Sequence, residues 1–243
     1  MSTDTTHIAV IIPTAGKGAR MGADQNKLFL DIEGISVLER TLSIFISHPA
    51  ITDICLVTTV QERDFIMELA QATLDRKQLD GRTIRLHFAV GGDTRRESVH
   101  NGLNTLAATP FKVSGREIVM VHDGARCFVD HPTIDRCIFQ ANVSGACVAA
   151  VPVKDTIKQV DKDKLIISTL DRDLLWQVQT PQAFFFDLLL EAYQKGPAHA
   201  TDDASLVEAL GHDVRIVQGS DFNIKITTPE DLIIGRAIAT HPR

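Results

Sequence analysis

The chain has 243 residues, a hydrophobic content of 44% and a formal net charge of −6. This composition supplies enough apolar material for one large core, and the acidic balance argues against a general nucleic-acid or anionic-membrane surface. No apolar run approaches a membrane-spanning length, and the first residues lack the basic and apolar regions of a signal peptide. We expect one domain over residues 1–243, located in the cytoplasm, with neither nucleic acid nor membrane as a partner.

The first part of the chain alternates between two hydrophobic patterns. Short apolar segments rich in β-branched residues predict buried strands, and they cover residues 7–12, 54–60, 84–90, 117–122 and 146–153. Apolar side chains at helical spacing predict helices between most of these strands, at residues 37–46, 63–74 and 97–106. This alternation is typical of an α/β fold with a mostly parallel sheet and helices on both faces.

The alternation breaks after residue 153, where the chain becomes charged and rich in turns. Residues 156–160 and 165–170 alternate between polar and apolar side chains and predict a β-hairpin. A hairpin by itself is only marginally stable in water. We therefore expect it to pack on a domain of its own or on a second subunit.

The last part of the chain returns to the α/β pattern. We expect a helix at residues 202–210, strands at 213–219 and 223–227, and a final helix that ends near residue 239. Thr228 as the cap and Asp231 three residues later are a start signal for that final helix. Pro229 at the first helical position strengthens the signal.

The cysteines show no pattern typical of a metal or redox site. They are Cys55, Cys127, Cys137 and Cys147. None forms a CxxC pair, and their spacing matches no familiar zinc site. We expect reduced thiols with a packing role.

The segment after the first predicted strand, residues 13–27, gathers glycines and cations in an otherwise acidic chain. Gly16 and Gly18 allow backbone N–H groups to converge on an anion. The cations are Lys17, Arg20 and Lys27. In open α/β sheets such a loop lies at the carboxyl ends of the strands, where ligands bind. The segment therefore predicts a phosphate site, although it matches neither the dinucleotide fingerprint nor the Walker loop.

Polar residues follow later strands in the same way. Thr94 and Glu97 form a capping-box pattern, so the preceding glycines and Asp93 are expected to be a turn that enters a helix. Asp123 and Arg126 follow the fourth strand, where Asp123 has three open interpretations: a divalent metal ligand, a hydroxyl ligand, or a structural partner of Arg126. Hydroxyls, carboxylates and a lysine come late in the chain, in residues 201–205 and 223–232. Together these positions predict a ligand cleft at one sheet edge.

Eight stretches, taken in order, resemble one enzyme family. They read PTAGKGARMG, NKLFL, GGDTRRESV, VHDGARCFV, VPVKDTIK, LWQVQTPQAF, TDDASLVE and NIKITTPEDL. In this order the chain resembles the 2-C-methyl-D-erythritol 4-phosphate cytidylyltransferases of the sugar nucleotidyltransferase superfamily. The resemblance implies a single Rossmann-like nucleotidyltransferase domain with a mostly parallel mixed sheet. It also implies a protruding β-hairpin arm, at about residues 153–180, that forms a homodimer.

The resemblance further implies the activity and its cofactor. CMP moves from CTP to 2-C-methyl-D-erythritol 4-phosphate, with release of pyrophosphate, and Mg²⁺ or another divalent cation is the cofactor. Arg20 and Lys27 are then the catalytic residues, and Asp123 is a metal ligand for an ion held mostly by phosphates. Leu28 departs from the family pattern, in which a glutamine is usual after the lysine.

The binding residues that the resemblance implies fall into two groups. The CTP-binding group consists of Pro13, Thr14, Ala15, Gly16, Lys17, Gly18, Gly92, Asp93, Ser98, Asp123, Gly124 and Ala125. The substrate-binding group consists of Arg126, Thr156, Arg172, Thr201, Asp202 and Lys225. Thr156 and Arg172 lie in the arm and are expected to serve the site of the partner subunit.

Three alternatives stay open from the sequence alone. A ribitol 5-phosphate cytidylyltransferase keeps the chemistry and changes the acceptor. A non-catalytic nucleotide-binding regulator has less need for Arg20, Lys27, Asp123 and Arg126 together. A Rossmann oxidoreductase lacks support because the third glycine of its fingerprint is missing.

Overall fold

The computed structural model describes residues 7–15, 26–77, 79–111, 115–197 and 200–241. They build a seven-stranded sheet in the order β11-β7-β10-β6-β1-β4-β5. Four neighbouring strands run parallel, and they are β1 (Ile8–Pro13), β4 (Asp53–Thr58), β5 (Arg85–Val90) and β6 (Ile118–Val121). The rest of the sheet consists of β7 (Ala146–Pro152), β10 (Trp176–Phe185) and β11 (Arg215–Gln218). The predicted mostly parallel sheet is confirmed.

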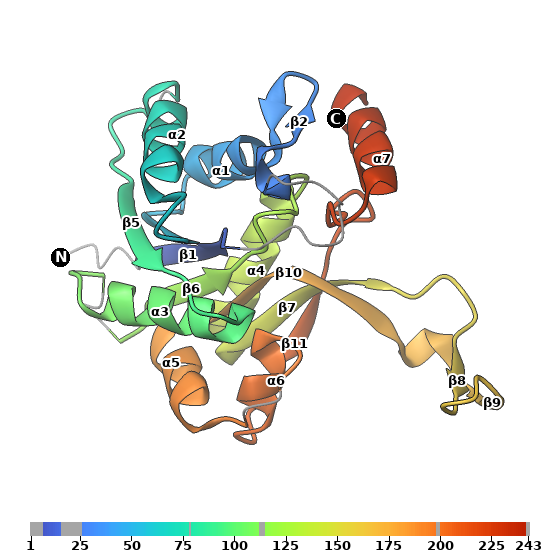
Figure 1. The fold of residues 1–243 in the computed structure, drawn as a ribbon. Helices are drawn as coiled ribbons and strands as arrows, with labels where there is room; N and C mark the ends of the chain where they lie inside the picture. The colour runs from blue at the N-terminus through green and yellow to red at the C-terminus, as the bar shows by residue number, and fades with distance from the viewer. Residues whose placement is uncertain (1–6, 16–25, 78, 112–114, 198–199, 242–243) are drawn as a thin grey trace.

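Helices cover both faces of this sheet (Figure 1). The helices of one face are α1 (Val37–Ser47), α2 (Arg63–Asp75), α4 (His131–Ser144) and α7 (Pro229–Thr240). The helices of the other face are α3 (Arg95–Ala107), α5 (Phe186–Lys195) and α6 (Asp203–Glu208). Each face of the sheet has its own hydrophobic core, and side chains of β1 alternate between the two. Val10 and Ile12 pack on the first face, and Ala9 and Ile11 pack on the second. The two-sided helical cover follows the predicted α/β class.

Strand β10 is a strand of the sheet that the sequence did not predict, and helices α4 and α5 were not predicted either. It lies between β6 and β7 and runs antiparallel to both. Its register on β7 shifts between Val178 and Gln182, so residues 179–181 form a bulge. Gln179, Thr180 and Gln182 are buried there, and these polar side chains hide the apolar pattern on which strand prediction depends.

The predicted strand at residues 223–227 is wrong, because this segment forms no ladder. Asn223 is buried, and its amide donates to the backbone carbonyl of Thr180 at 2.8 Å. The N–H of Ile226 donates to the carbonyl of Ala125 at 2.9 Å. Side-chain bonds to the β10 bulge and a bond to the loop after β6 therefore hold the segment in place.

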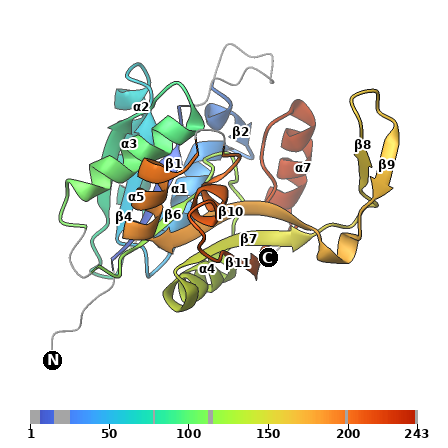
Figure 2. The ribbon, with the colours of Figure 1, turned by 90° about the horizontal axis from the view of Figure 1, so that it is seen from below.

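The predicted hairpin is confirmed as β8 (Lys158–Val160) and β9 (Ile166–Thr169). It projects away from the body of the molecule in both views (Figures 1 and 2). A short 3-10 helix, η2 (Arg172–Leu174), leads back to β10. Since Trp176 already pairs with Pro152 of β7, the predicted arm of about residues 153–180 overlaps the first half of β10.

Two further expectations concern the cysteines and the membrane. All four cysteines are buried and none of them forms a disulfide, as the packing interpretation expects. Within the part of the chain that the structure describes, no helix has the length and apolar character needed to cross a membrane.

Candidate active site

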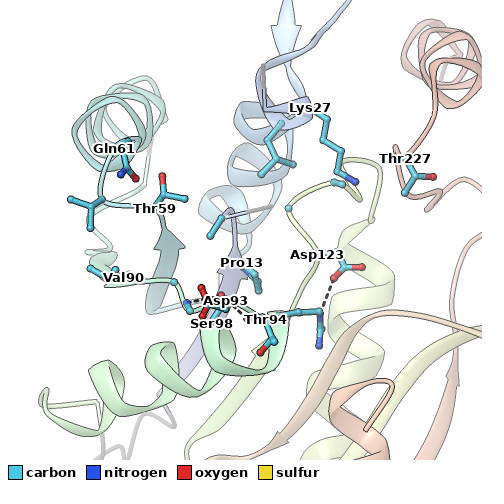
Figure 3. Close-up of a pocket in the computed structure, with 18 of the residues that line it drawn as sticks. Pro13, Lys27, Thr59, Gln61, Val90, Asp93, Thr94, Ser98, Asp123 and Thr227 are labelled. Atoms are coloured by element: carbon cyan, nitrogen blue, oxygen red, sulfur yellow. Dashed lines mark hydrogen bonds and ion pairs between the residues drawn. The ribbon is translucent and has the colours of Figure 1, made fainter. Parts of the chain in front are cut away.

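A cleft of about 740 Å³ opens at the carboxyl ends of the parallel strands. The segments that follow β1, β4, β5 and β6 line it, together with the segment that carries Lys225 (Figure 3). The predicted site residues that line the cleft are Pro13, Ala15, Lys27, Gly92, Asp93, Ser98, Asp123, Gly124, Ala125 and Lys225. Gly16, Lys17, Gly18 and Arg20 lie outside the described residues. Thus segments from both ends of the chain meet at the predicted sheet edge.

The turn before α3 is held rigidly at one wall of the cleft. The predicted capping box is present, because the Glu97 N–H donates to Thr94 Oγ1 at 3.1 Å and Glu97 Oε2 accepts from the Thr94 N–H at 3.2 Å. Glu97 Oε2 also accepts from the Asp93 N–H at 2.7 Å, and Ser98 Oγ accepts from the Gly92 N–H at 3.2 Å. These bonds fix the backbone of the turn.

Only glycine fits the approach of this turn to the end of β1. A Cβ atom added to Gly91 would lie 2.7 Å from the Cβ atom of Ala15. Such a contact is far shorter than ordinary van der Waals distance. Gly91 therefore allows the turn to lie close to the end of β1.

Lys27 begins a short 3-10 helix, η1 (Lys27–Phe29), at the wall opposite α3. Leu28 is 3% exposed and packs into the core between the sheet and α1. A Cβ atom on Gly124 would lie 3.3 Å from Leu28 Cδ1, so the Leu28 side chain packs closely against the backbone of Gly124. The leucine that departs from the family pattern therefore anchors η1 by apolar packing.

Asp123, in the loop after β6, lies at one end of the cleft and is surrounded by three positively charged side chains. Its carboxylate lies 2.8 Å from Lys225 Nζ, 3.5 Å from Arg95 Nε and 3.7 Å from Arg126 Nε. Burial alone would raise the pKa of Asp123, but the positive charges of Lys225, Arg95 and Arg126 hold that pKa well below its usual range. The carboxylate is therefore ionised at neutral pH. In Figure 3, Lys27, Asp123 and Thr227 surround this end, and Thr59, Gln61 and Val90 lie at the other.

A buried hydrogen-bond relay holds the loop that carries Asp123. The Asp123 N–H donates to Thr180 Oγ1 at 3.0 Å, and the Thr180 hydroxyl lies 3.2 Å from His122 Nδ1. His122 Nε2 lies 3.0 Å from the Arg126 carbonyl, so the proton sits on Nε2. Burial lowers the pKa of His122 to about 4, so the imidazole is neutral at neutral pH. The bulge of β10 thereby sets the position of Asp123.

Several predicted site residues do not line this cleft. The Thr14 hydroxyl is buried and donates to the Val57 carbonyl at 2.9 Å. The Arg126 Nε atom lies 3.7 Å from the Asp123 carboxylate, and the Arg126 guanidinium donates to the Asn223 carbonyl at 2.8 Å. Asp202 caps α6 by accepting from the Ser205 N–H at 3.0 Å, and Thr201 precedes it on the surface.

The two predicted residues of the arm are also remote from the cleft of their own chain. Thr156 and Arg172 are exposed, and Arg172 donates to the Lys154 carbonyl at 3.0 Å. Neither residue lines the cleft. This arrangement leaves both side chains available outside the subunit that carries them.

Some cleft residues were missed by the sequence reasoning. They are Leu28, Thr59, Val60, Gln61, Val90, Gly91, Thr94, Arg95 and Thr227. Thr59 and Gln61 follow β4 directly, so the rule that polar residues after parallel strands reach the cleft would have indicated them. Arg95 had no such signal, because its position depends on a partner far away in the sequence. Its guanidinium donates to the two oxygens of the buried Asp203 carboxylate, at the start of α6, at 3.0 and 2.7 Å.

The donor set of the cleft suits a magnesium ion held largely by phosphates. Among the described residues, no group of three or more His, Cys, Asp or Glu side chains is placed to hold a metal. Mg²⁺ in phosphate-transfer sites is usually bound through one or two carboxylates plus the phosphates of the substrate. The ionised Asp123 carboxylate fits this arrangement.

Comparison with known proteins identifies one group of similar sequences. The family model described as IspD, 2-C-methyl-D-erythritol 4-phosphate cytidylyltransferase, matches residues 8–241. The enzyme of that name from Alkaliphilus oremlandii is 43% identical over 233 residues, which cover 95% of this chain and 94% of the relative. The one from Bacillus velezensis is 45% identical over 235 residues, with 94% of each chain covered.

Solved structures give the same result. The 4-diphosphocytidyl-2C-methyl-D-erythritol synthase of Anaerococcus prevotii has a TM-score of 0.81 and 31% identity, covering 98% of this chain and 100% of that one. The 2-C-methyl-D-erythritol 4-phosphate cytidylyltransferase of Thermus thermophilus has a TM-score of 0.71 and 32% identity, covering 97% and 100%. The similarity therefore extends over the whole sheet and its helices.

Proposed function

This chain belongs to the 2-C-methyl-D-erythritol 4-phosphate cytidylyltransferase family, and on that premise we propose how its cleft carries out the reaction. The enzyme transfers CMP from CTP to 2-C-methyl-D-erythritol 4-phosphate, a step of isoprenoid biosynthesis. The products are 4-diphosphocytidyl-2-C-methyl-D-erythritol and pyrophosphate. One observation carries the proposal: the rigid turn before α3, Lys27 and the Lys225–Asp123 pair line a single cleft.

The chemistry needs alignment and charge compensation more than acid–base catalysis. An oxygen of the substrate phosphate forms a bond to the α-phosphorus of CTP, and the bond to the β-phosphate oxygen breaks. The second pKa of a phosphate monoester is about 6, so the nucleophile is largely dianionic at neutral pH and needs no general base. The obstacle is repulsion between this dianion and the triphosphate, which fixed cations and N–H donors reduce.

The two ends of the cleft take different parts of this reaction in our proposal. The turn before α3, with Gly92, Asp93 and Ser98, receives the cytidine. Lys27, together with Arg20 from outside the described residues, compensates the charge that develops on the transferring phosphoryl group. Lys225 receives the phosphate of the acceptor, since its Nζ atom faces the cleft beside Asp123. When Lys225 turns to that phosphate, Arg95 and Arg126 remain beside the carboxylate.

Magnesium is the cofactor in this proposal, with Asp123 as the protein residue that would hold it. When bound, the ion supplies neutralisation of the triphosphate charge. Because Asp123 is ionised and its loop is fixed by Thr180 and His122, the carboxylate does not need to be deprotonated or reoriented by large backbone movement.

An acceptor assay tests the proposed function. Pyrophosphate release is measured with CTP, Mg²⁺ and either 2-C-methyl-D-erythritol 4-phosphate or ribitol 5-phosphate, and we expect rapid turnover only with the first. Faster turnover with ribitol 5-phosphate would identify the enzyme as a ribitol 5-phosphate cytidylyltransferase. CTP binding by calorimetry without turnover on either acceptor would instead indicate a nucleotide-binding regulator.

The arm supports a further part of the proposal, a homodimer whose two sites are each completed by the partner. Leu165 is 69% exposed and Leu174 is 79% exposed, and Ile166 and Ile167 between them are also exposed. Such an apolar surface on a two-stranded hairpin and on the short helix η2 that follows it is typical of a segment that packs on another chain. Thr156 and Arg172 would then reach the acceptor end of the partner's cleft.

Mixing two weakly active variants tests this arrangement. We expect Lys27→Ala and Arg172→Ala to be weakly active alone and to regain activity when they are unfolded together and refolded as a mixture. In a mixed dimer one site has lost both residues, while the other combines an intact Lys27 with an intact Arg172. A mixture of Lys27→Ala and Lys225→Ala is the matched control. We expect no recovery of activity in that mixture, because both residues belong to the cleft of one subunit and each site therefore lacks one of them. Absence of regain in the first mixture, or a monomeric mass by light scattering, would contradict the shared site.

A further inference from the structure

The side chain of Asn26 joins three parts of the site. Its Nδ2 atom donates to the Thr14 carbonyl at 3.0 Å and to Glu62 Oε1 at 3.0 Å. Its Oδ1 atom accepts from the Leu28 N–H at 3.1 Å, which caps η1. Both amide protons and the carbonyl oxygen of Asn26 are therefore used.

The partners of Asn26 are themselves fixed to β4. The N–H and the hydroxyl of Thr14 both donate to the Val57 carbonyl, at 2.7 and 2.9 Å. Glu62 Oε2 accepts from the Thr59 hydroxyl at 3.1 Å, and the Thr59 oxygen accepts from the Glu62 N–H at 3.2 Å. We refer to Thr14, Asn26, Thr59 and Glu62 as the Asn26 clasp. It ties the start of η1 to the carboxyl ends of β1 and β4.

We propose that Asn26 is a positioning residue for the transfer reaction, which it serves by fixing the backbone from which Lys27 reaches the cleft. This inference rests on the proposed function, because it concerns the placement of its charge-compensating lysine. A lysine side chain is long and flexible, so the position of its ammonium group depends on how firmly its backbone is held. Leu28 holds one side of η1 in the core, and the clasp holds the other.

The clasp needs an amide at position 26. Aspartate has the same shape as asparagine and keeps the oxygen that accepts from Leu28, but it has no proton for either acceptor. Asn26→Asp would therefore place a carboxylate against the Thr14 carbonyl and Glu62 Oε1, and two hydrogen bonds would become repulsive contacts. Glu62→Gln provides a compensating change, because the glutamine amide can donate to the new carboxylate.

The experiment compares kcat and both KM values among the wild type, Asn26→Asp, Glu62→Gln and the double variant. We expect Asn26→Asp to lower kcat by about 10–100-fold, the loss typical of a small misplacement of a catalytic group. KM for CTP and for the polyol phosphate should change by less than about threefold, because the binding groups stay in place. Glu62→Gln should be close to wild type, since its amide oxygen can still accept from Asn26. The double variant should recover about tenfold in kcat relative to Asn26→Asp, because one of the two lost links returns.

Asn142→Asp is the matched control. Asn142 is exposed on α4 and donates to the Ile138 carbonyl at 3.1 Å. Helix α4 contributes no residue to the lining of the cleft. The same substitution there should leave kcat unchanged. Thermal unfolding and circular dichroism of each variant measure the folded fraction, so kcat is expressed per folded subunit.

Two results would overturn the inference. One is a kcat of Asn26→Asp, per folded subunit, within twofold of wild type, and the other is a double variant no better than Asn26→Asp. If Asn26→Asp does not fold, Glu62→Ala carries the test, because it removes one link at a partly exposed site. A several-fold loss of kcat in Glu62→Ala supports the inference, and an unchanged kcat overturns it. An inactive wild-type enzyme would count against the proposed function and not against the clasp.

Discussion

Replacing Lys27 with alanine is expected to lower kcat by at least about a hundredfold while the protein still folds. The reaction brings a dianionic phosphate to a triphosphate, and negative charge gathers on the transferring group. A preorganised donor at such a position is typically worth about 3–4 kcal/mol of transition-state stabilisation. Lys27 lines the cleft at the start of η1, and its removal leaves the buried Leu28 anchor intact. The measurement is the rate of pyrophosphate release at saturating concentrations of both substrates.

The matched control for this change is Lys195→Ala. Lys195 lies in the last turn of α5, where its Nζ atom pairs with Glu191 at 2.8 Å in an exposed position. Its removal should leave turnover unchanged, because an exposed pair of this kind contributes little. We expect Arg20→Ala to resemble Lys27→Ala, from the family pattern. Near-wild-type turnover in Lys27→Ala would remove the catalytic assignment of this residue.

Replacing Lys225 with methionine is expected to raise KM for the polyol phosphate by about 10–100-fold, since a hydrogen bond to a charged group is worth about 1.5–3 kcal/mol. The Lys225 Nζ atom lies 2.8 Å from the Asp123 carboxylate, at the cleft end that we assign to the acceptor. Methionine keeps much of the apolar stem and removes the charge. KM for CTP should stay within about threefold of wild type, because the turn before α3 is unaffected.

The two KM values decide between specific and general effects of the Lys225 change. A rise confined to the polyol phosphate supports the assignment of Lys225 to the acceptor phosphate. An equal rise in both KM values would indicate that the cleft as a whole is disturbed, and no rise in either would contradict the assignment. Lys195→Met is the control here, with both KM values expected to match wild type.

Much of the fold was predictable because its signals are local. The alternation of apolar periodicities predicted β1, β4, β5, β6 and β7 and the helices α1, α2 and α3 between the first four of them, and the capping box at Thr94 predicted the start of α3. Parallel strands also send their carboxyl ends to one edge. For that reason the sequence predicted a common cleft for residues after β1, β5 and β6, and the cleft is there.

The family resemblance supplied what local patterns do not contain. It assigned the reaction and the roles of individual residues, among them substrate binding by Lys225. The structure places Lys225 in the cleft, where its Nζ atom lies 2.8 Å from the Asp123 carboxylate. Residues 223–227 reach this point without forming the predicted strand.

The sequence by itself determined the class of fold, the edge at which the ligand cleft opens and the turns and helix starts that form its walls. Tertiary structure alone decided the insertion of β10, the fixing of Arg95 by Asp203 and the relay from Thr180 through His122 to the loop of Asp123. The first group depends on periodicity and capping among residues close in the chain. The second depends on buried polar side chains that form hydrogen bonds with residues far away in the sequence. Such hydrogen bonds leave no periodic pattern in the sequence.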